Sequence, residues 1–248
     1  MATQTVLADT IELVCKCLDD ILPSNGTTAT IAVDLEGDKL CREGTIAIMQ
    51  LYREQSTTVW LIDVTTLKDL AFDTVNAEGR SLRGVLEDKD IKKIFYDVRN
   101  DSDALYHHYS IHIKNPYDLQ ILELAVRHHS RRQTRFLNGL ARVIDQYLRP
   151  NAEWKAVKEA GVKLFRPSDG GSYKVFESRP LDPRIAAYCA QDVILLFDLG
   201  DVMKRILGHA YDRIWEDRVI AASNARVAET HSSTYRPNGP HKAISPII

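Results

Sequence analysis

The 248-residue chain lacks several features that would place it in a specialised class of protein. Four cysteines are too few for a disulfide framework, and the pair at positions 15 and 17 has no second Cys/His pair at zinc spacing. No apolar run approaches the ~20 residues of a membrane span, and residues 1–6 lack the basic and apolar parts of a signal peptide. We therefore expect free thiols at Cys15, Cys17, Cys41 and Cys189, in an intracellular protein of the cytoplasm, the nucleus or both.

The chain also lacks an excess of positive charge. Its 32 Lys and Arg residues face 34 Asp and Glu residues, for a net charge of −2. This balance argues against a histone-like protein and against one that binds polyanions through a basic tail, because such proteins are strongly basic. It leaves open an enzyme of nucleic acids whose positive charge is local.

The residue pattern predicts an α/β domain, with a mixed sheet built from the first half and covered by helices. Strand-like runs rich in Ile, Val, Thr and Trp cover residues 30–36, 45–52 and 58–64, and two further strands are predicted over 93–98 and 116–120. The first three are joined by short links, which favour an antiparallel meander. Helical spacing of apolar residues covers 6–22, 81–87, 101–109, 137–148, 153–159, 183–207 and 210–228. We expect an N-terminal helical part (1–27), a main domain (28–208), a C-terminal helix (209–230) and a flexible tail (231–248).

Two acidic residues lie at the end of the first predicted strand. Asp34 and Glu36 follow the apolar residues 31–33, and strand residues two apart point to the same face. Carboxylates side by side repel each other unless a cation lies between them. The pair therefore indicates either a cation site or a solvated strand end.

Two further clusters contain acids. Tyr188 and Asp192 are four residues apart in the helix predicted over 183–207, so both emerge from one helix face. Asp is a poor residue for a helix interior, which leaves a hydrogen-bonded core pair or a functional pair. Asp101 follows the predicted strand 93–98, where it would start a helix as its N-cap or serve a site.

Together the three clusters resemble the signature of the DEDD superfamily of 3′–5′ exonucleases. The tyrosine places the resemblance in the DEDDy branch, with ribonuclease D, the Werner-syndrome exonuclease and Egalitarian/EXD-like proteins. Residues 44–51, residues 116–120 and Arg179-Pro180-Leu181 resemble further parts of ribonuclease D-like domains. The resemblance covers about 28–208 and implies a ribonuclease H-like fold: a mixed five- to six-stranded sheet flanked by helices, with an extra helical C-terminal part.

The resemblance also implies a two-metal centre. Its ligands would be Asp34, Glu36, Asp101 and Asp192, and carboxylate oxygens suit Mg²⁺ or Mn²⁺. Tyr188 would orient, or help to deprotonate, the attacking water. Asp97 and Asp103 are alternatives to Asp101; the spacing to the apolar residues 111–113 favours Asp101, and Asp97 is expected to be structural.

The implied activity is hydrolysis of the last phosphodiester of a single-stranded 3′ end, with release of nucleoside 5′-monophosphates. RNA is favoured; a DNA exonuclease and a catalytically weak RNA-binding scaffold are the alternatives. By family analogy, Leu35, Gly37 and Gln50 would line the cleft. The basic segment 127–135 is a solvated helix end or a phosphate track, with Arg131, Arg132 and Arg135 as its candidate contacts. The protein would act as a monomer or a homodimer.

Overall fold

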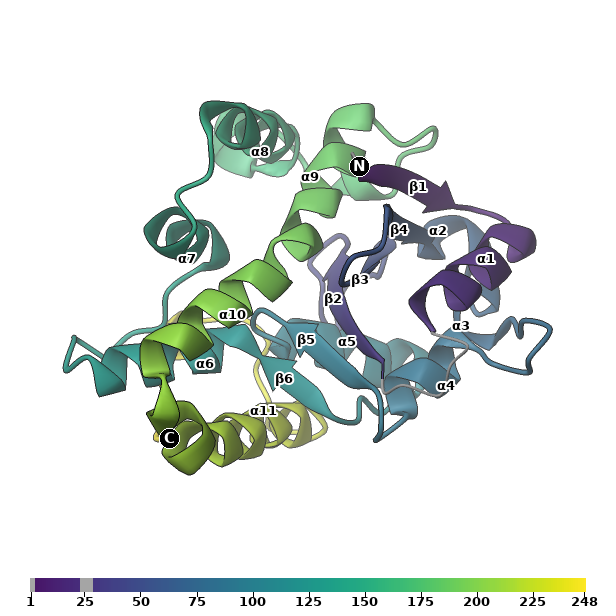
Figure 1. The fold of residues 1–248 in the computed structure, drawn as a ribbon. Helices are drawn as coiled ribbons and strands as arrows, with labels where there is room; N and C mark the ends of the chain where they lie inside the picture. Colours follow the sequence, from purple (N-terminus) through teal and green to yellow (C-terminus); the bar gives the residue numbers. More distant parts are fainter. Residues whose placement is uncertain (1–2, 23–28) are drawn as a thin grey trace.

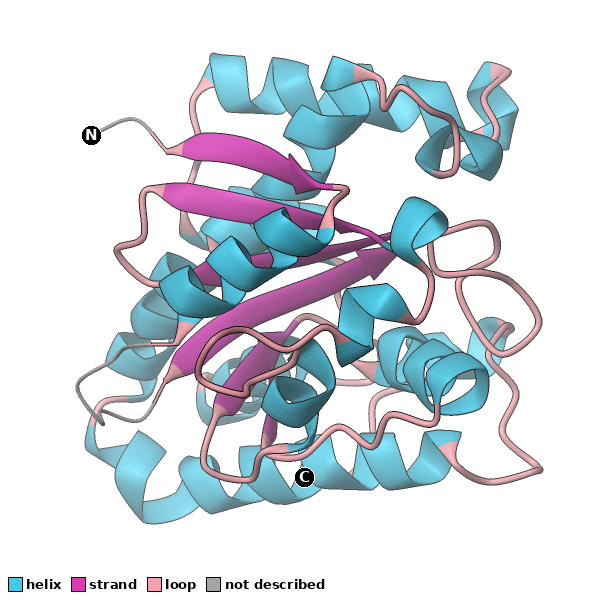
Figure 2. Cartoon of the chain, turned by 90° about the vertical axis from the view of Figure 1, so that its right-hand side faces the viewer, coloured by secondary structure: helices cyan, strands magenta, loops and turns pink. Residues whose placement is uncertain are grey.

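A computed structural model describes residues 3–22 and 29–248. Six strands form one mixed sheet in the order β1-β4-β3-β2-β5-β6, with helices on both faces (Figures 1 and 2). The predicted α/β architecture is thereby confirmed. The strands are β1 Gln4–Ala8, β2 Thr30–Glu36, β3 Ile48–Arg53, β4 Thr58–Asp63, β5 Lys92–Phe95 and β6 Pro116–Asp118.

The centre of the sheet is the expected antiparallel meander. β3 pairs antiparallel with both β2 and β4, while β1 joins β4, and β5 joins β2 and β6, in parallel. The register places Asp34 of β2 opposite Gln50 of β3. Directly opposed residues project from the same face of a sheet, so Gln50 and Asp34 share a face.

Two apolar cores, one on each face, hold the helices to the sheet. Val33 and Leu35 of β2 lie in the core that α1, α4 and α5 cover, and Ala32 lies in the core that α6, α9 and α10 cover. The even-numbered residues of β2 therefore face α9. The helices are α1 Ile11–Ile21, α2 Val64–Leu67, α3 Leu70–Asp73, α4 Leu82–Glu87, α5 Arg99–Tyr109, α6 Leu119–His129, α7 Leu140–Tyr147, α8 Ala152–Phe165, α9 Pro183–Ile194, α10 Leu196–Leu207 and α11 Glu216–Thr230.

The N-terminal prediction was wrong in one respect. Residues 4–8 form a strand of the sheet and only residues 11–21 are helical, with Thr10 as N-cap accepting from the backbone N–H of Leu13. Val6 and Leu7 fit both a helical face and a strand, and parallel pairing with β4 decides between them. The remainder of segment 1–27, at residues 1–2 and 23–27, lies outside the described residues.

The C-terminal part also differs from the prediction. The helix predicted over 183–207 is divided at Leu195 into α9 and α10, and α11 is preceded by a π-helical turn at Tyr211–Trp215. Residues 231–248, expected as a flexible tail, lie against the domain. Ile244 forms a β-bridge with Phe136, and the Ser245 N–H donates to the Arg135 carbonyl (3.1 Å). Among the described helices, none is long and apolar enough to cross a membrane.

Candidate active site

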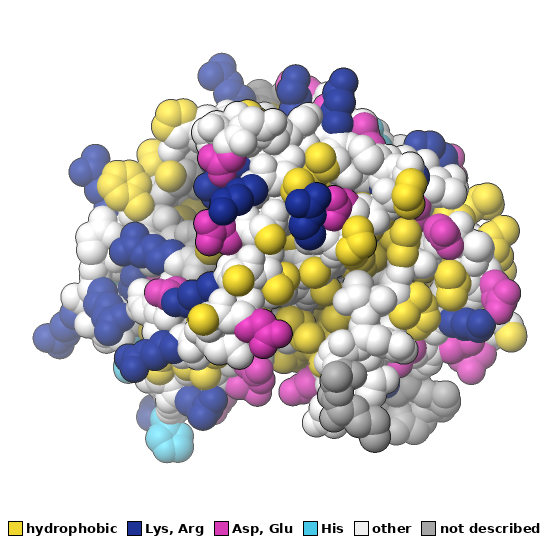
Figure 3. Space-filling view, turned by 90° about the horizontal axis from the view of Figure 1, so that it is seen from above, with side chains coloured by type: hydrophobic (Ala, Val, Ile, Leu, Met, Phe, Trp, Pro, Cys, Tyr) yellow, Lys and Arg dark blue, Asp and Glu magenta, His cyan; other side chains and the backbone are white. Residues whose placement is uncertain are grey.

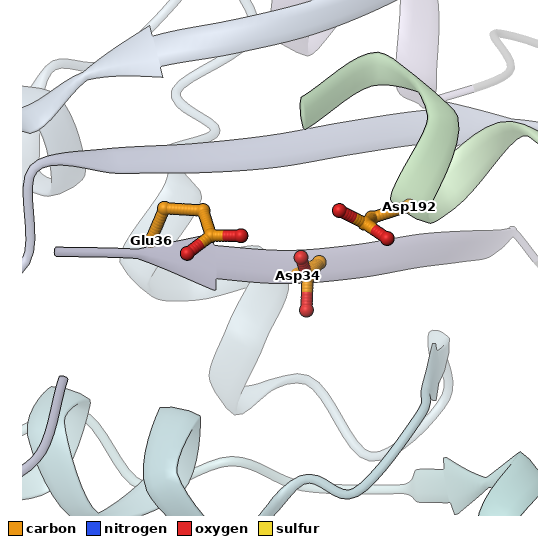
Figure 4. Close-up of side chains that lie close together, drawn as sticks. All are labelled: Asp34, Glu36 and Asp192. Carbon is orange, nitrogen blue, oxygen red and sulfur yellow. The ribbon is translucent and has the colours of Figure 1, made fainter. Parts of the chain in front are cut away.

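The centre of the candidate site is a group of three carboxylates. Asp34 and Glu36 project from the end of β2, and Asp192 approaches them from α9 (Figure 4). Each contributes a carboxylate oxygen to a set whose members all lie within 4.8 Å of one another. The structure therefore brings the acidic pair of β2 and the acid of α9 together, although they are far apart in the sequence.

Tyr188 and Asp192 owe their places to the start of α9. Asp182 caps this helix by accepting from the backbone N–H of Arg184 (2.8 Å), and Pro183 fits the first turn, where its missing N–H costs no hydrogen bond. The helix then carries Tyr188 and Asp192 onto the face that meets β2. Asp192 is 5% exposed.

Asp101 lies in the first turn of α5 and is 5% exposed. It is not the N-cap, because that position belongs to Val98. Burial, followed by the negative charge of Asp34, raises the pKa of Asp101 well above its ordinary value. Asp101 is thus an electrostatic neighbour of Asp34, outside the tight group of three.

The two alternatives to Asp101 are both occupied by guanidinium groups. Asp97 accepts from Arg99 Nε (2.6 Å) and Nη2 (2.7 Å). Asp103 accepts from the backbone N–H (2.7 Å) and the Nε (2.9 Å) of Arg42. Within the described part of the chain, no Lys or Arg forms an ion pair with Asp101, which leaves its carboxylate available to a ligand.

A second carboxylate fixes the turn before α5. Asp118 accepts from the backbone N–H groups of Asp97 (2.8 Å), Val98 (3.1 Å) and Gln120 (3.0 Å), and from the guanidinium of Arg226 (2.6 Å). Asp97 adopts a positive φ of 66°, a conformation that these bonds hold in place. Asp118 and Arg226 are buried, so α11 helps to position α5 and with it Asp101.

Lys158 supplies a cation that sequence reasoning did not assign to the centre. Its ammonium group, reaching from α8, forms an ion pair with Asp192 and lies 3.7 Å from the centre of the Tyr188 ring. The close approach of α8 to α9 depends on Gly161, because a Cβ there would lie 2.4 Å from the Cβ of Tyr188. No pattern in the sequence of α8 separates Lys158 from the other lysines of that helix, so sequence reasoning had no signal for it.

The carboxylates of the centre have too little positive charge around them for all of them to ionise readily. Burial and the charge of Asp192 raise the pKa of Asp34 to about 8, and burial and the charge of Asp34 raise the pKa of Glu36 well above its ordinary value. Such shifts show that the carboxylates are short of counter-charge. Hard oxygen donors this close together fit Mg²⁺ or Mn²⁺, which makes the donor set suitable for the expected ions.

The residues expected to contact substrate lie in varied settings. The Leu35 side chain is in the core, and Gly37 packs so tightly that a Cβ would lie 2.0 Å from the Thr45 carbonyl oxygen. Gln50 is fully buried, and neither its Oε1 nor its Nε2 has a partner in the described structure. Arg131, Arg132 and Arg135 are exposed and follow the end of α6, on a segment separate from the carboxylates.

The chain resembles known proteins both in sequence and in structure. The chain is 25% identical to the piRNA biogenesis protein EXD1 of Xenopus laevis over 173 residues (70% of this chain, 37% of that protein), and 32% identical to mouse EXD1 over 96 residues (39% and 15%). It thus spans well under half the length of these relatives.

Solved structures share the fold. The structure of Trypanosoma brucei RNase D in complex with RNA U12 superposes with a TM-score of 0.73 at 18% identity, covering 99% of this chain and 77% of that one. The catalytic core of RRP6 from the same organism gives a TM-score of 0.65 at 19% identity (91% and 52%). A family model described as 3′-5′ exonuclease matches residues 4–208. The resemblance drawn from the sequence is confirmed, and the chain belongs to the 3′–5′ exonuclease family of the ribonuclease H-like superfamily.

Proposed function

We propose that the chain is a metal-dependent 3′–5′ exonuclease that removes nucleoside 5′-monophosphates from single-stranded ends, with RNA preferred. The observation that carries the proposal is the set of Asp34, Glu36 and Asp192 oxygens within 4.8 Å of one another at the end of β2. Three buried or half-buried carboxylates this close together, with Asp101 nearby, are costly unless cations lie among them.

Two divalent cations would be held by these acids, one by Asp34, Glu36 and Asp192 and the other by Asp34 and Asp101. Bound there, they would neutralise the carboxylates and stabilise the attacking and leaving oxygens of an in-line displacement. The protein's own part is to hold the four acids on two rigid elements, β2 and α9, and on the first turn of α5.

Tyr188 would orient the attacking water through its hydroxyl. Burial and the charges of Asp192 and Glu36 raise the pKa of Tyr188 above its ordinary value. The phenol therefore stays protonated at neutral pH and would act as a hydrogen-bonding group, not as the base that deprotonates the water.

RNA preference rests on the relatives. EXD1 is named for piRNA biogenesis, and the Trypanosoma RNase D structure contains RNA. Positive charge for a strand is available: Lys and Arg side chains gather on the left of Figure 3, the side on which Figure 1 draws α7 and α8. In the proposed complex, the backbone at Leu35 and Gly37 lines the cleft with Gln50 beneath it, and Arg131, Arg132 and Arg135 lie along the strand.

A labelled-strand assay tests the proposal. Single-stranded RNA and DNA labelled at the 5′ end are incubated with the protein in Mg²⁺, Mn²⁺ or EDTA, beside an Asp34→Asn variant. We expect a ladder of products shortened from the 3′ end, stronger with RNA, and abolished by EDTA and by the substitution. Equal ladders on both strands would indicate an exonuclease without RNA preference. Binding of RNA without degradation in any metal would overturn the proposal in favour of an RNA-binding scaffold.

A further inference from the structure

A second site lies between the end of α6 and α7, separate from the carboxylates. It is a pocket of about 320 Å³ whose lining includes Arg127, Arg132, Arg142, Phe136, Asn138 and Gln146. Among the described residues that line it there is no acid. A pocket with three guanidinium groups and no carboxylate on its walls is suited to an anion.

Arg127 is the buried arginine of this pocket, and hydrogen bonds hold it in place. It is 5% exposed, its Nε donates to both carboxylate oxygens of Glu123 (2.9 Å each), and its Nη1 donates to the Gln133 carbonyl (2.6 Å). Its Nη2, however, has no partner in the described structure. A buried charged donor without an acceptor is costly, so a ligand oxygen would satisfy a group that the protein leaves open.

The remaining charge of the pocket is not neutralised by the protein. Glu123 is already shared between Arg127 and the Asn138 Nδ2 (2.9 Å). Arg132 and Arg142 are exposed, and no described carboxylate lies within ion-pair distance of either. The buried hydroxyl of Tyr147 on α7 lies close to Glu123, Arg132 and Arg127.

We propose that this pocket binds one backbone phosphate of a single-stranded nucleic acid, as a second contact of the strand whose 3′ end enters the carboxylate centre. The inference rests on the proposed function for the identity of that strand. A strand is favoured over free phosphate because Phe136 is 46% exposed on the pocket wall, with the Arg135 guanidinium 5.1 Å from its ring centre, so that a ring and a cation are both available to a neighbouring base.

The test measures binding of a 12-nucleotide single-stranded RNA to the full chain in EDTA, where no cleavage occurs. The double variant Arg132→Gln/Arg142→Gln is compared with the control Arg205→Gln/Arg213→Gln. The control arginines are also exposed and outside ion pairs in the described structure, and they lie on α10 and the turn after it. Both variants thus lose the same charge.

We expect the pocket variant to bind RNA about tenfold more weakly, with the slope of log K against log salt shallower by about 0.7, the value for one phosphate of a single strand. The control should bind within twofold of the wild type. Equal losses of RNA affinity in the pocket variant and the control would overturn the proposal, because they would show that RNA binds to diffuse surface charge. Unchanged RNA affinity, with inorganic phosphate raising the thermal midpoint of the wild type and not of the pocket variant, would show a free-phosphate site instead.

The test is separable from that of the proposed function. If the wild type does not shorten RNA, but the pocket variant binds RNA more weakly than the wild type, the pocket is supported and the nuclease activity is refuted. Conversely, if the wild type degrades RNA and the pocket variant binds RNA as tightly as the wild type, only the phosphate-binding role of the pocket is refuted. Mn²⁺ binding to both double variants should match the wild type, which checks that the carboxylate centre is intact.

Discussion

The ammonium group of Lys158 lies 3.7 Å from the centre of the Tyr188 ring while it pairs with the Asp192 carboxylate. One lysine thus contacts both candidate site residues of α9, which are themselves four positions apart. The ring face attracts a cation, and the carboxylate attracts it more strongly. Lys158 provides the centre with positive charge of its own, at the place where a divalent cation would bind Asp192.

Replacing Lys158 should therefore strengthen metal binding. In Lys158→Met the ammonium no longer competes for Asp192, and we expect the affinity for Mn²⁺ to rise about tenfold, equivalent to about 1.4 kcal/mol. Titration calorimetry measures this directly. Lys155→Met is the matched control, because Lys155 is on the same helix in an exposed ion pair with Asp145. An unchanged affinity in Lys158→Met would mean that the lysine does not compete with metal.

Substitutions at Tyr188 and at the acids should differ in severity. Tyr188→Phe removes only a water-orienting hydroxyl, so we expect kcat to fall at most about 10²-fold. Asp34→Asn and Asp192→Asn each remove a proposed ligand of the cation site, and we expect losses of about 10³-fold or more. Single-turnover cleavage of labelled RNA gives the rates. If Tyr188→Phe were the slowest of the three, the assignment of the metal ligands would be wrong.

The contact between α8 and α9 should tolerate no side chain at Gly161. In Gly161→Ala the new methyl group would meet Tyr188, so we expect unfolding to become easier by about 1–3 kcal/mol and RNA cleavage to slow. Urea denaturation measures the first effect. Gly139→Ala is the control: its φ is −77°, no described atom lies within 4 Å of the added Cβ, and the cost should stay below about 1 kcal/mol. Equal destabilisation by both substitutions would contradict the role of Gly161.

The raised pKa of Asp34 gives the metal-free protein a distinctive pH dependence. Since the folded pKa, about 8, lies above that of the unfolded chain, the folded state binds the extra proton. The stability that this one group contributes should therefore be fully present below about pH 4 and be lost as pH rises toward 8, by at most about 1.4 kcal/mol per pH unit.

Chemical denaturation at pH 5, 6.5 and 8 tests this dependence in EDTA and in Mn²⁺. Mn²⁺ favours the ionised carboxylates and should flatten the curve above pH 6, and Asp34→Asn should flatten it in EDTA. A metal-free protein that gains stability from pH 5 to 8 would show that other groups control the titration.

The geometry of the carboxylates was predictable because local periodicity determines it. Strand alternation places Asp34 and Glu36 on one face, and helical spacing places Tyr188 beside Asp192. Their meeting in space came from the family resemblance, since no local rule brings β2 and α9 together.

What the sequence did not reveal depends on packing between distant segments. Lys158 reaches Asp192 only because Gly161 lets two helices approach closely, and nothing in the pattern of α8 distinguishes Lys158 from Lys155. The tail was predicted to be flexible from its Ser, Pro and Gly content, yet the Lys242 carbonyl accepts from Arg99 Nη2 (3.0 Å). The strand at residues 4–8 depends on its partner β4, which lies about fifty residues further along the chain.

The family match ends at residue 208, but the bond from Arg226 to Asp118 crosses that boundary. A chain cut at 208 would leave the Asp118 carboxylate without its guanidinium partner, beside the turn that leads into α5. The last forty residues therefore pack as part of the same domain as the sheet that carries the carboxylates, and we expect amide protons of α5 and α11 to exchange with solvent in a shared opening event.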